Sequence, residues 1–221
     1  MEVDILCGRF FVGPEIIDFV KYSAICFDTE FTEIFDSEDI YPSQMACVLY
    51  KKEESITAIP LKWGFKISCS PALLINIRAE TALLKRTFVN AVHSRRCVIP
   101  ASGFYEWSSN GEKSKFFRKD SKPLYMAGIY ETDGYEDRFA VITTSANDSV
   151  ESVHVRMPLI IENSQLNQWL NNGNAFEKVL NQKPIELDRK TDYEQIRLII
   201  VSTTKTSAPA ASRILACSLY T

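Results

Sequence analysis

The chain has few residues that could support metal or imidazole chemistry. Its 221 residues include only two histidines, His93 and His154, and six cysteines with no Cys-x-x-Cys pair. A structural zinc site needs four such ligands at characteristic spacings. We therefore expect no metal site and no cofactor, and any imidazole chemistry has to use one of the two histidines.

Long apolar runs and an excess of basic residues are also missing. No apolar run reaches the 18 residues typical of a membrane-spanning helix, and the acidic Glu2 and Asp4 do not fit the basic start of a secretory signal. We expect a cytoplasmic protein with free thiols and no membrane partner. The formal net charge of −3 argues against a surface that binds polyanions everywhere, so any nucleic-acid site must be local.

The pattern of apolar and turn residues indicates more strands than helices. Helices are predicted at residues 14–25, 80–92 and 164–170. Residues 44–107 are otherwise strand-like, and further strands are predicted at 115–118, 124–130, 139–144 and 197–201. Strands and helices do not alternate regularly. We expect an α+β fold, in which residues 1–221 form a single domain on a curved, largely antiparallel, barrel-like sheet with flanking helices.

Three residues far apart in the sequence could form a covalent site. Cys7 stands in Cys-Gly-Arg-Phe, where Arg9 could favour a thiolate, although an unpaired cysteine is often a small buried hydrophobic residue. Glu106 stands in Gly-Phe-Tyr-Glu-Trp; burial would raise its pKa and suit it to proton transfer, whereas an outward side chain would simply be hydrated. His154 is predicted to lie in an irregular loop near the surface, two residues before Arg156.

A second polar pattern lies between two apolar positions. If the segment is extended, Asn76 and Arg78 share one face and alternate with Ile75 and Ile77. The pattern fits contact with phosphate and equally fits an ordinary exposed strand. The acidic stretch at residues 28–39 is interpreted as a solvated connection without a function.

Four segments in this order resemble the SRAP family, also called SOS response-associated peptidases or abasic-site processing proteins. They are Cys-Gly-Arg-Phe from Cys7, Asn-x-Arg-x-Glu-Thr from Asn76, Cys-x-x-Pro-Ala-x-Gly-Phe-Tyr-Glu-Trp from Cys97, and His-x-Arg-Met-Pro from His154. The resemblance runs from Cys7 to about Leu170. The ordered set is far more specific than any one of its members.

The resemblance implies a DNA-damage protein that recognises abasic sites in single-stranded DNA and joins the sugar aldehyde to an N-terminal cysteine as a thiazolidine. We expect a monomer that associates with the nucleoid when bound to DNA. By resemblance, Cys7 would be the nucleophile and Asn76 the residue that orients it. Glu106 would be the proton-transfer group and His154 the acid/base partner. The phosphate contacts would be Arg9, Arg78 and Arg156.

The chemistry needs a cysteine with a free α-amine. An α-amine has a pKa of roughly 7.7 to 8.0 and can condense with an aldehyde near neutral pH. The neighbouring thiol then closes a five-membered ring. The intermediate Schiff base also permits strand cleavage by β-elimination, so a lyase activity is expected beside crosslinking. Binding should weaken as the salt concentration rises.

The chain departs from the family at its start, because six residues precede Cys7. A thiol within a peptide can form only a reversible hemithioacetal with an aldehyde. Residues 1–6 are therefore interpreted as a removable leader, lost by self-cleavage, or as the product of a wrongly assigned start. The remaining explanation is a divergent member that binds DNA without crosslinking.

Other departures concern contacts with DNA bases. The tryptophans that members often carry after Gly64 are absent, so base stacking, worth roughly 1–3 kcal/mol per base, would be weaker or supplied by Phe65, Phe104 or Trp107. Asp39 stands where an asparagine is usual. The segment after Val201 lacks the expected ending, which puts DNA contacts there in doubt.

Two further functions remain open at this point. Cys7, His154 and Glu106 could instead form a cysteine-type peptidase or hydrolase, if the thiolate attacked an amide. The chain could also be a single-strand or junction binder that has lost the chemistry.

Overall fold

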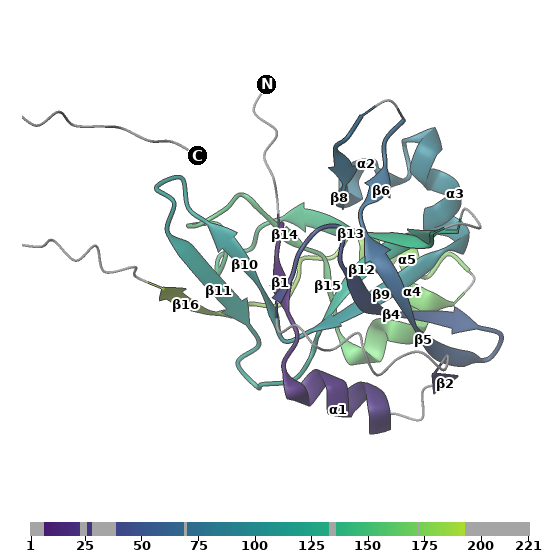
Figure 1. The fold of residues 1–221 in the computed structure, drawn as a ribbon, viewed down its shortest axis with the longest axis horizontal. Coiled ribbons are helices and arrows are strands. Elements are labelled where there is room, and N and C mark those ends of the chain that lie inside the picture. The colour runs from purple at the N-terminus through teal and green to yellow at the C-terminus, as the bar shows by residue number, and fades with distance from the viewer. Residues whose placement is uncertain are drawn as a thin grey trace, which may run out of the picture.

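Two β-sheets form the framework of the protein. The computed structural model describes residues 7–22, 26–27, 39–68, 70–132, 136–171 and 173–192. In Figure 1 the smaller sheet lies to the left and the larger sheet to the right, with the first helix below the N-terminal strand. Within the described ranges, no helix has the length and apolar character needed to cross a membrane.

The larger sheet closes on itself. Its strands follow the order β14-β13-β12-β9-β4-β5-β2, with β8 beside β13 and β15 beside β12. The strands are β2 (Cys26–Phe27), β4 (Met45–Lys52), β5 (Ser55–Trp63), β8 (Asn76–Arg78), β9 (Arg96–Ala101), β12 (Leu124–Glu131), β13 (Arg138–Ser145), β14 (Arg156–Pro158) and β15 (Ile160–Ile161). Because β13 also pairs in parallel with β5, the strands β13, β12, β9, β4 and β5 form a closed circuit. The predicted α+β class and the curved, barrel-like sheet are confirmed.

The smaller sheet is antiparallel and contains the N-terminal strand. Its order is β16-β11-β10-β1-β3. The strands are β1 (Phe10–Phe11), β3 (Asp39–Ile40), β10 (Gly103–Trp107), β11 (Lys113–Phe117) and β16 (Asp188–Asp192), and a separate hairpin joins β6 (Phe65–Lys66) to β7 (Leu73–Leu74). Since β1 lies between β10 and β3, the start of the described chain is brought to the strand that carries Glu106.

The helices agree with the sequence in part. They are α1 (Pro14–Tyr22), α2 (Ala79–Ala82), α3 (Arg86–Ser94), the 3-10 helix η2 (Asn163–Gln165), α4 (Leu166–Leu170) and α5 (Phe176–Leu180). The single helix predicted at 80–92 is wrong, because a turn at residues 83–85 interrupts it. There the backbone N–H groups of Leu84 and Lys85 both donate to the Thr81 carbonyl at 3.1 Å, and Leu84 is 79% exposed.

Other boundaries differ less. The helix predicted at 164–170 begins as a 3-10 turn, and α5 was not expected from the sequence. The last residues of the helix predicted at 14–25 and the whole strand predicted at 197–201 lie outside the described residues. The other three strands predicted after residue 107 are confirmed as β11, β12 and β13.

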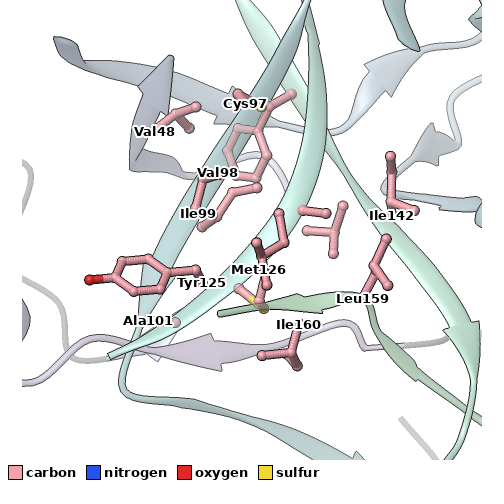
Figure 2. Close-up of a cluster of buried hydrophobic side chains, with 14 of the residues drawn as sticks. Val48, Cys97, Val98, Ile99, Ala101, Tyr125, Met126, Ile142, Leu159 and Ile160 are labelled. Atoms are coloured by element: carbon pink, nitrogen blue, oxygen red, sulfur yellow. The ribbon is translucent and has the colours of Figure 1, made fainter. Parts of the chain in front are cut away.

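Apolar side chains from both sheets join one buried cluster. Figure 2 shows its centre, where Val98 and Ile99 of β9 lie beside Met126 of β12, with Ile142 and Leu159 completing the packing. Burying such side chains supplies most of the stability of a fold. This rigid core sets the positions of the strand ends at which the candidate site is found.

Candidate functional site

Cys7 and Glu106 meet in the interior, as the resemblance implied. The backbone N–H of Cys7 donates to Glu106 Oε1 at 2.7 Å. Cys7 is fully buried and Glu106 is 2% exposed. Cys7 has a φ of 41°, in the left-handed region, where a residue with a side chain is strained by roughly 1–3 kcal/mol. The backbone nitrogen of the predicted nucleophile is thus held by a buried carboxyl group.

Both groups titrate above their ordinary range. Burial raises the pKa of Glu106 from 4.5 to about 8, against the opposing effect of hydrogen bonds from the backbone N–H groups of Cys7 and Trp107. Burial, and then the charge of Glu106, raise the pKa of the Cys7 thiol well above its usual value. The burial predicted for Glu106 is confirmed. Of the two interpretations of Cys7, the structure agrees with the buried residue and not with a thiolate favoured by Arg9.

Arg9 is engaged elsewhere. Its guanidinium forms an ion pair with Asp39 and lies over two aromatic rings, 4.8 Å from the centroid of Tyr41 and 4.7 Å from that of Tyr105. Of the acidic stretch interpreted as a solvated connection, Asp39 instead lies in strand β3 and is partnered by Arg9; residues 28–38 lie outside the described residues. Asp39 therefore supplies the counter-charge of Arg9.

The second group of predicted residues surrounds the end of β13. Arg156 makes a bidentate pair with Glu80, at 2.8 and 2.9 Å, and donates to the Thr143 carbonyl at 2.8 Å. Hydrogen bonding to Arg156 lowers the pKa of Glu80. Asn76 and Arg78 lie in β8, on the other edge of β13, where Arg78 pairs with Thr143. Their predicted extended conformation is confirmed, and Arg78 is exposed.

His154 lies in the half-buried loop between β13 and β14, as predicted. Its Nδ1 accepts the backbone N–H of Arg156 at 3.1 Å, so the neutral ring carries its proton on Nε2. Its own backbone N–H donates to the Val150 carbonyl at 3.1 Å. Within the described ranges, no hydrogen bond joins His154 directly to Cys7 or Glu106. The other histidine, His93, lies in α3 against Phe176, with ring centroids 5.3 Å apart.

Two connections hold these groups near each other. Phe10, three residues after Cys7, packs on Trp63 with ring centroids 5.1 Å apart, and the Trp63 indole donates to the Ile75 carbonyl at 3.0 Å, next to Asn76. The second connection is Arg189, which bonds to Ser114 and Ser152. These contacts link the sheet that carries Cys7 and Glu106 to the segments of the larger sheet that carry Asn76 and His154.

Arg189 of β16 was missed by sequence reasoning. Its Nε donates to Ser114 Oγ at 3.1 Å, and its Nη1 donates to Ser152 Oγ at 3.1 Å. Ser114 is the direct cross-strand neighbour of Glu106, and Ser152 is in the loop that carries His154. No local motif marks Arg189, because the two partners that link the sheet to the loop lie 75 and 37 residues away; its third partner is Thr191.

The aromatic residues considered for base stacking are not equivalent. Phe104 is fully buried and Phe65 is 3% exposed, whereas Trp107 is 39% exposed. The suggestion that Phe65 or Phe104 could stack on a base is therefore wrong. Only Trp107 of these three offers a ring to solvent.

The comparisons with known proteins agree with this architecture. The family described as SOS response associated peptidase (SRAP) matches residues 6–205. The chain is 29% identical over 210 residues to the abasic site processing protein YoqW of Bacillus subtilis, which covers 88% of this chain and 94% of that protein. It is 26% identical over 178 residues to the abasic site processing protein YedK of Escherichia coli, covering 75% and 79%.

A solved structure from Bacteroides thetaiotaomicron superposes with a TM-score of 0.70 at 20% identity, over 84% of this chain and 91% of that one. That likeness concerns the fold. The family match extends over nearly the whole chain and includes every predicted site residue. The chain therefore belongs to the SOS response associated peptidase family.

Proposed function

We propose that this protein processes abasic sites in single-stranded DNA by capturing the ring-opened sugar covalently at Cys7, once Cys7 is the first residue. The observation that carries the proposal is the 2.7 Å hydrogen bond from the Cys7 backbone nitrogen to the buried Glu106 carboxyl group. That nitrogen would become the reacting α-amine. Two relatives named abasic site processing proteins support the choice of substrate.

Exposing the amine requires cleavage of the bond between Leu6 and Cys7. In the proposed step the Cys7 sulfur attacks the Leu6 carbonyl carbon, the C–N bond breaks, and Glu106 gives its proton to the departing nitrogen while the thiol proton passes, directly or through water, to the Glu106 carboxylate. Water then hydrolyses the thioester and releases residues 1–6 as a carboxylate. Glu106 suits this role because its pKa of about 8 keeps it protonated at neutral pH.

Capture would follow from the new N-terminus. The neutral amine adds to the aldehyde carbon, and water leaves after protonation of the hydroxyl group by Glu106 or His154. The Cys7 sulfur then attacks the carbon of the C=N bond, its proton passes to a carboxylate or to water, and a thiazolidine forms. Overall, one aldehyde and one aminothiol give one ring and one water. Loss of a C2′ proton from the Schiff base, with departure of the 3′ phosphate, is the competing lyase route.

The arginines would position the strand. A guanidinium presents a planar donor fork to phosphate oxygens. Exposed Arg78 would bind a phosphate group directly. Arg9 would first have to release Asp39, and Arg156 would first have to release Glu80. Asn76 would orient Cys7 or the sugar from the edge of β13.

Peptide hydrolysis in trans receives less support. Cys7 is fully buried, and the pKa of its thiol is raised rather than lowered. The hydrogen bonds of His154 within the described ranges serve its own loop. These features suit attack on the chain's own peptide bond better than attack on another protein.

The test is an intact mass measurement, with and without single-stranded DNA that carries one abasic site. We expect a mass lacking residues 1–6 and a heat-stable adduct, both lost in Cys7→Ala. A second chain that begins at Cys7 separates leader removal from capture. If that chain also forms no adduct while its fold is intact by circular dichroism, the proposal is wrong.

A further inference from the structure

The outer face of the smaller sheet carries a row of alternating aromatic and basic side chains. Antiparallel pairing sets Tyr105 opposite Lys115 and Lys115 opposite Lys190, and Arg9 precedes Phe10 on the neighbouring strand. Residues directly opposite in an antiparallel pair project on the same side. The other side of this sheet carries Phe10, with 0% exposure, and turns to the core.

The rings of this face are covered by cations. Lys115 Nζ lies 3.7 Å from the centroid of the Phe11 ring, and Lys113 Nζ lies 4.4 Å from that of Tyr105. Arg9 also lies over the Tyr105 ring but is paired with Asp39, so the basic side chains of this face stand on β1, β11 and β16. The register also places Asp39 and Asp188 on this face, so its positive charge is concentrated at the lysines of β11 and β16 rather than spread over the whole face.

Lys115 and Lys190 are the unusual members. Like charges directly opposite in an antiparallel pair repel each other. Across the described residues, no carboxylate forms an ion pair with either lysine. Arg118 and Lys122, by contrast, are partnered by Asp120. A pair of facing, uncompensated lysines is stabilised when an anion lies between them.

Lys115 and Lys190 both line a cavity. Its volume is about 620 Å³, and its lining includes Phe11, Tyr105, Lys115, Arg118, Lys122 and Lys190. The one carboxylate of the lining is Glu15, which accepts a hydrogen bond from Ser102. Sites of this size commonly hold ligands, and the balance of charge selects an anionic one.

We propose that this outer face binds the sugar–phosphate backbone of the DNA strand that continues away from the abasic site, with Lys115 and Lys190 as a shared phosphate clamp. This inference rests on the proposed function. Continuity favours this occupant: Arg9 joins the row two residues after Cys7, and Trp107, 39% exposed, is on the same face beside Tyr105, with ring centroids 6.5 Å apart. Basic grooves with exposed rings are the usual platform for single strands.

The test uses the double variant Lys115→Gln with Lys190→Gln. Its matched control is Lys52→Gln with Lys178→Gln, two exposed lysines on β4 and α5. Binding of undamaged single-stranded oligonucleotides of about 4 and about 16 nucleotides, the limits of typical site sizes, is measured by fluorescence anisotropy over a range of salt concentrations.

We expect the double variant to bind the long oligonucleotide about tenfold more weakly. Its slope of log affinity against log salt should fall by about 1.4, two phosphate contacts at about 0.7 each. The short oligonucleotide, the control variant and the variant Lys115→Arg with Lys190→Arg should behave as wild type. An unchanged slope for the long oligonucleotide overturns the inference.

Crosslinking distinguishes this inference from the proposed function. If Cys7 forms an adduct but the slope does not depend on the two lysines, the clamp alone is wrong. If no adduct forms yet the slope depends on the lysines, the clamp stands and the covalent chemistry is wrong. If the affinity for the short oligonucleotide also fell, the lysines would belong to the site around Cys7. The proposal that a separate outer face binds the continuing strand would then be refuted.

Discussion

Glu106 and Arg96 are both ionisable residues withdrawn from water, with 2% and 4% of their surface exposed, but their surroundings differ. The Arg96 guanidinium donates to four backbone carbonyls, those of Val92, His93, Trp169 and Asn171. Glu106 accepts only backbone N–H groups, and within the described ranges no cation pairs with it.

The difference separates a structural charge from a candidate for proton transfer. Arg96 satisfies carbonyls at the ends of α3 and α4, which a helix leaves unpaired, and burial lowers its pKa only to about 10, so it stays charged. Glu106 has a pKa of about 8, close to the pH at which it would work. A buried group that can exchange its proton near neutral pH is a candidate for catalysis.

The largest effect should come from Glu106→Gln. Gln keeps an oxygen to accept the Cys7 N–H but cannot transfer a proton, so we expect self-cleavage and adduct formation to slow by about 10² to 10⁴ fold. Affinity for undamaged single-stranded DNA should change less than about twofold, because no phosphate contact is assigned to Glu106. Single-turnover adduct formation and anisotropy measure the two quantities. Equal rates in wild type and variant would remove Glu106 from the mechanism.

Arg96→Met should instead destabilise the fold and have no direct effect on the chemistry at Cys7. Removing the guanidinium leaves four carbonyls unpaired, at about 3–5 kcal/mol in the free energy of unfolding. Urea denaturation measures this loss. The neighbouring Arg95→Met is the control, since Arg95 is half-buried and donates once, to the Tyr130 carbonyl at 3.2 Å. A loss for Arg96→Met no greater than for Arg95→Met would contradict the structural role.

The pH dependence of the free energy of unfolding should further distinguish Glu106 from Arg96. Because the pKa of Glu106 rises from 4.5 to about 8 on folding, the folded protein holds this proton more tightly than the unfolded one. Stability should therefore fall as pH rises through this range, by up to about 1.4 kcal/mol per pH unit. Urea denaturation should find Glu106→Gln progressively more stable than wild type from pH 5 to 8. A pH-independent difference would place the pKa of Glu106 outside that range.

Glu80 provides the opposite sign and the smallest effect. Its pKa is lowered by Arg156, so its pairing stabilises the protein above the unfolded pKa and is lost in acid. Glu80→Gln should lower stability at neutral pH by less than about 1 kcal/mol, since the pair is partly exposed. It should also free Arg156 and raise the affinity for single-stranded DNA about twofold. Weaker DNA binding in Glu80→Gln would argue against Arg156 as a phosphate contact.

Local patterns in the sequence were sufficient for much of the fold. Runs of apolar, β-branched and aromatic residues bounded by turn residues predicted β11, β12 and β13, and β12 and β13 are each buried over six consecutive residues. The break between α2 and α3 was not predictable from composition, since Ala, Leu, Lys and Arg all favour helix. In the structure the turn leaves Leu84 79% exposed, while Ala82 before it and Phe88 after it are buried.

For the site, the sequence alone determined the residue types, their order and the family, because an ordered set of motifs can be recognised without knowing which residues are in contact. The resemblance already implied that Cys7, Glu106 and His154 act together. Only the tertiary structure decided the electrostatics: that burial makes the Cys7 thiol a weaker acid despite Arg9, that Asp39 takes the Arg9 charge, and that Arg189 links Ser114 to the loop of His154. A pKa and an ion pair depend on desolvation and on partners distant in sequence, and these exist only once the sheets have packed.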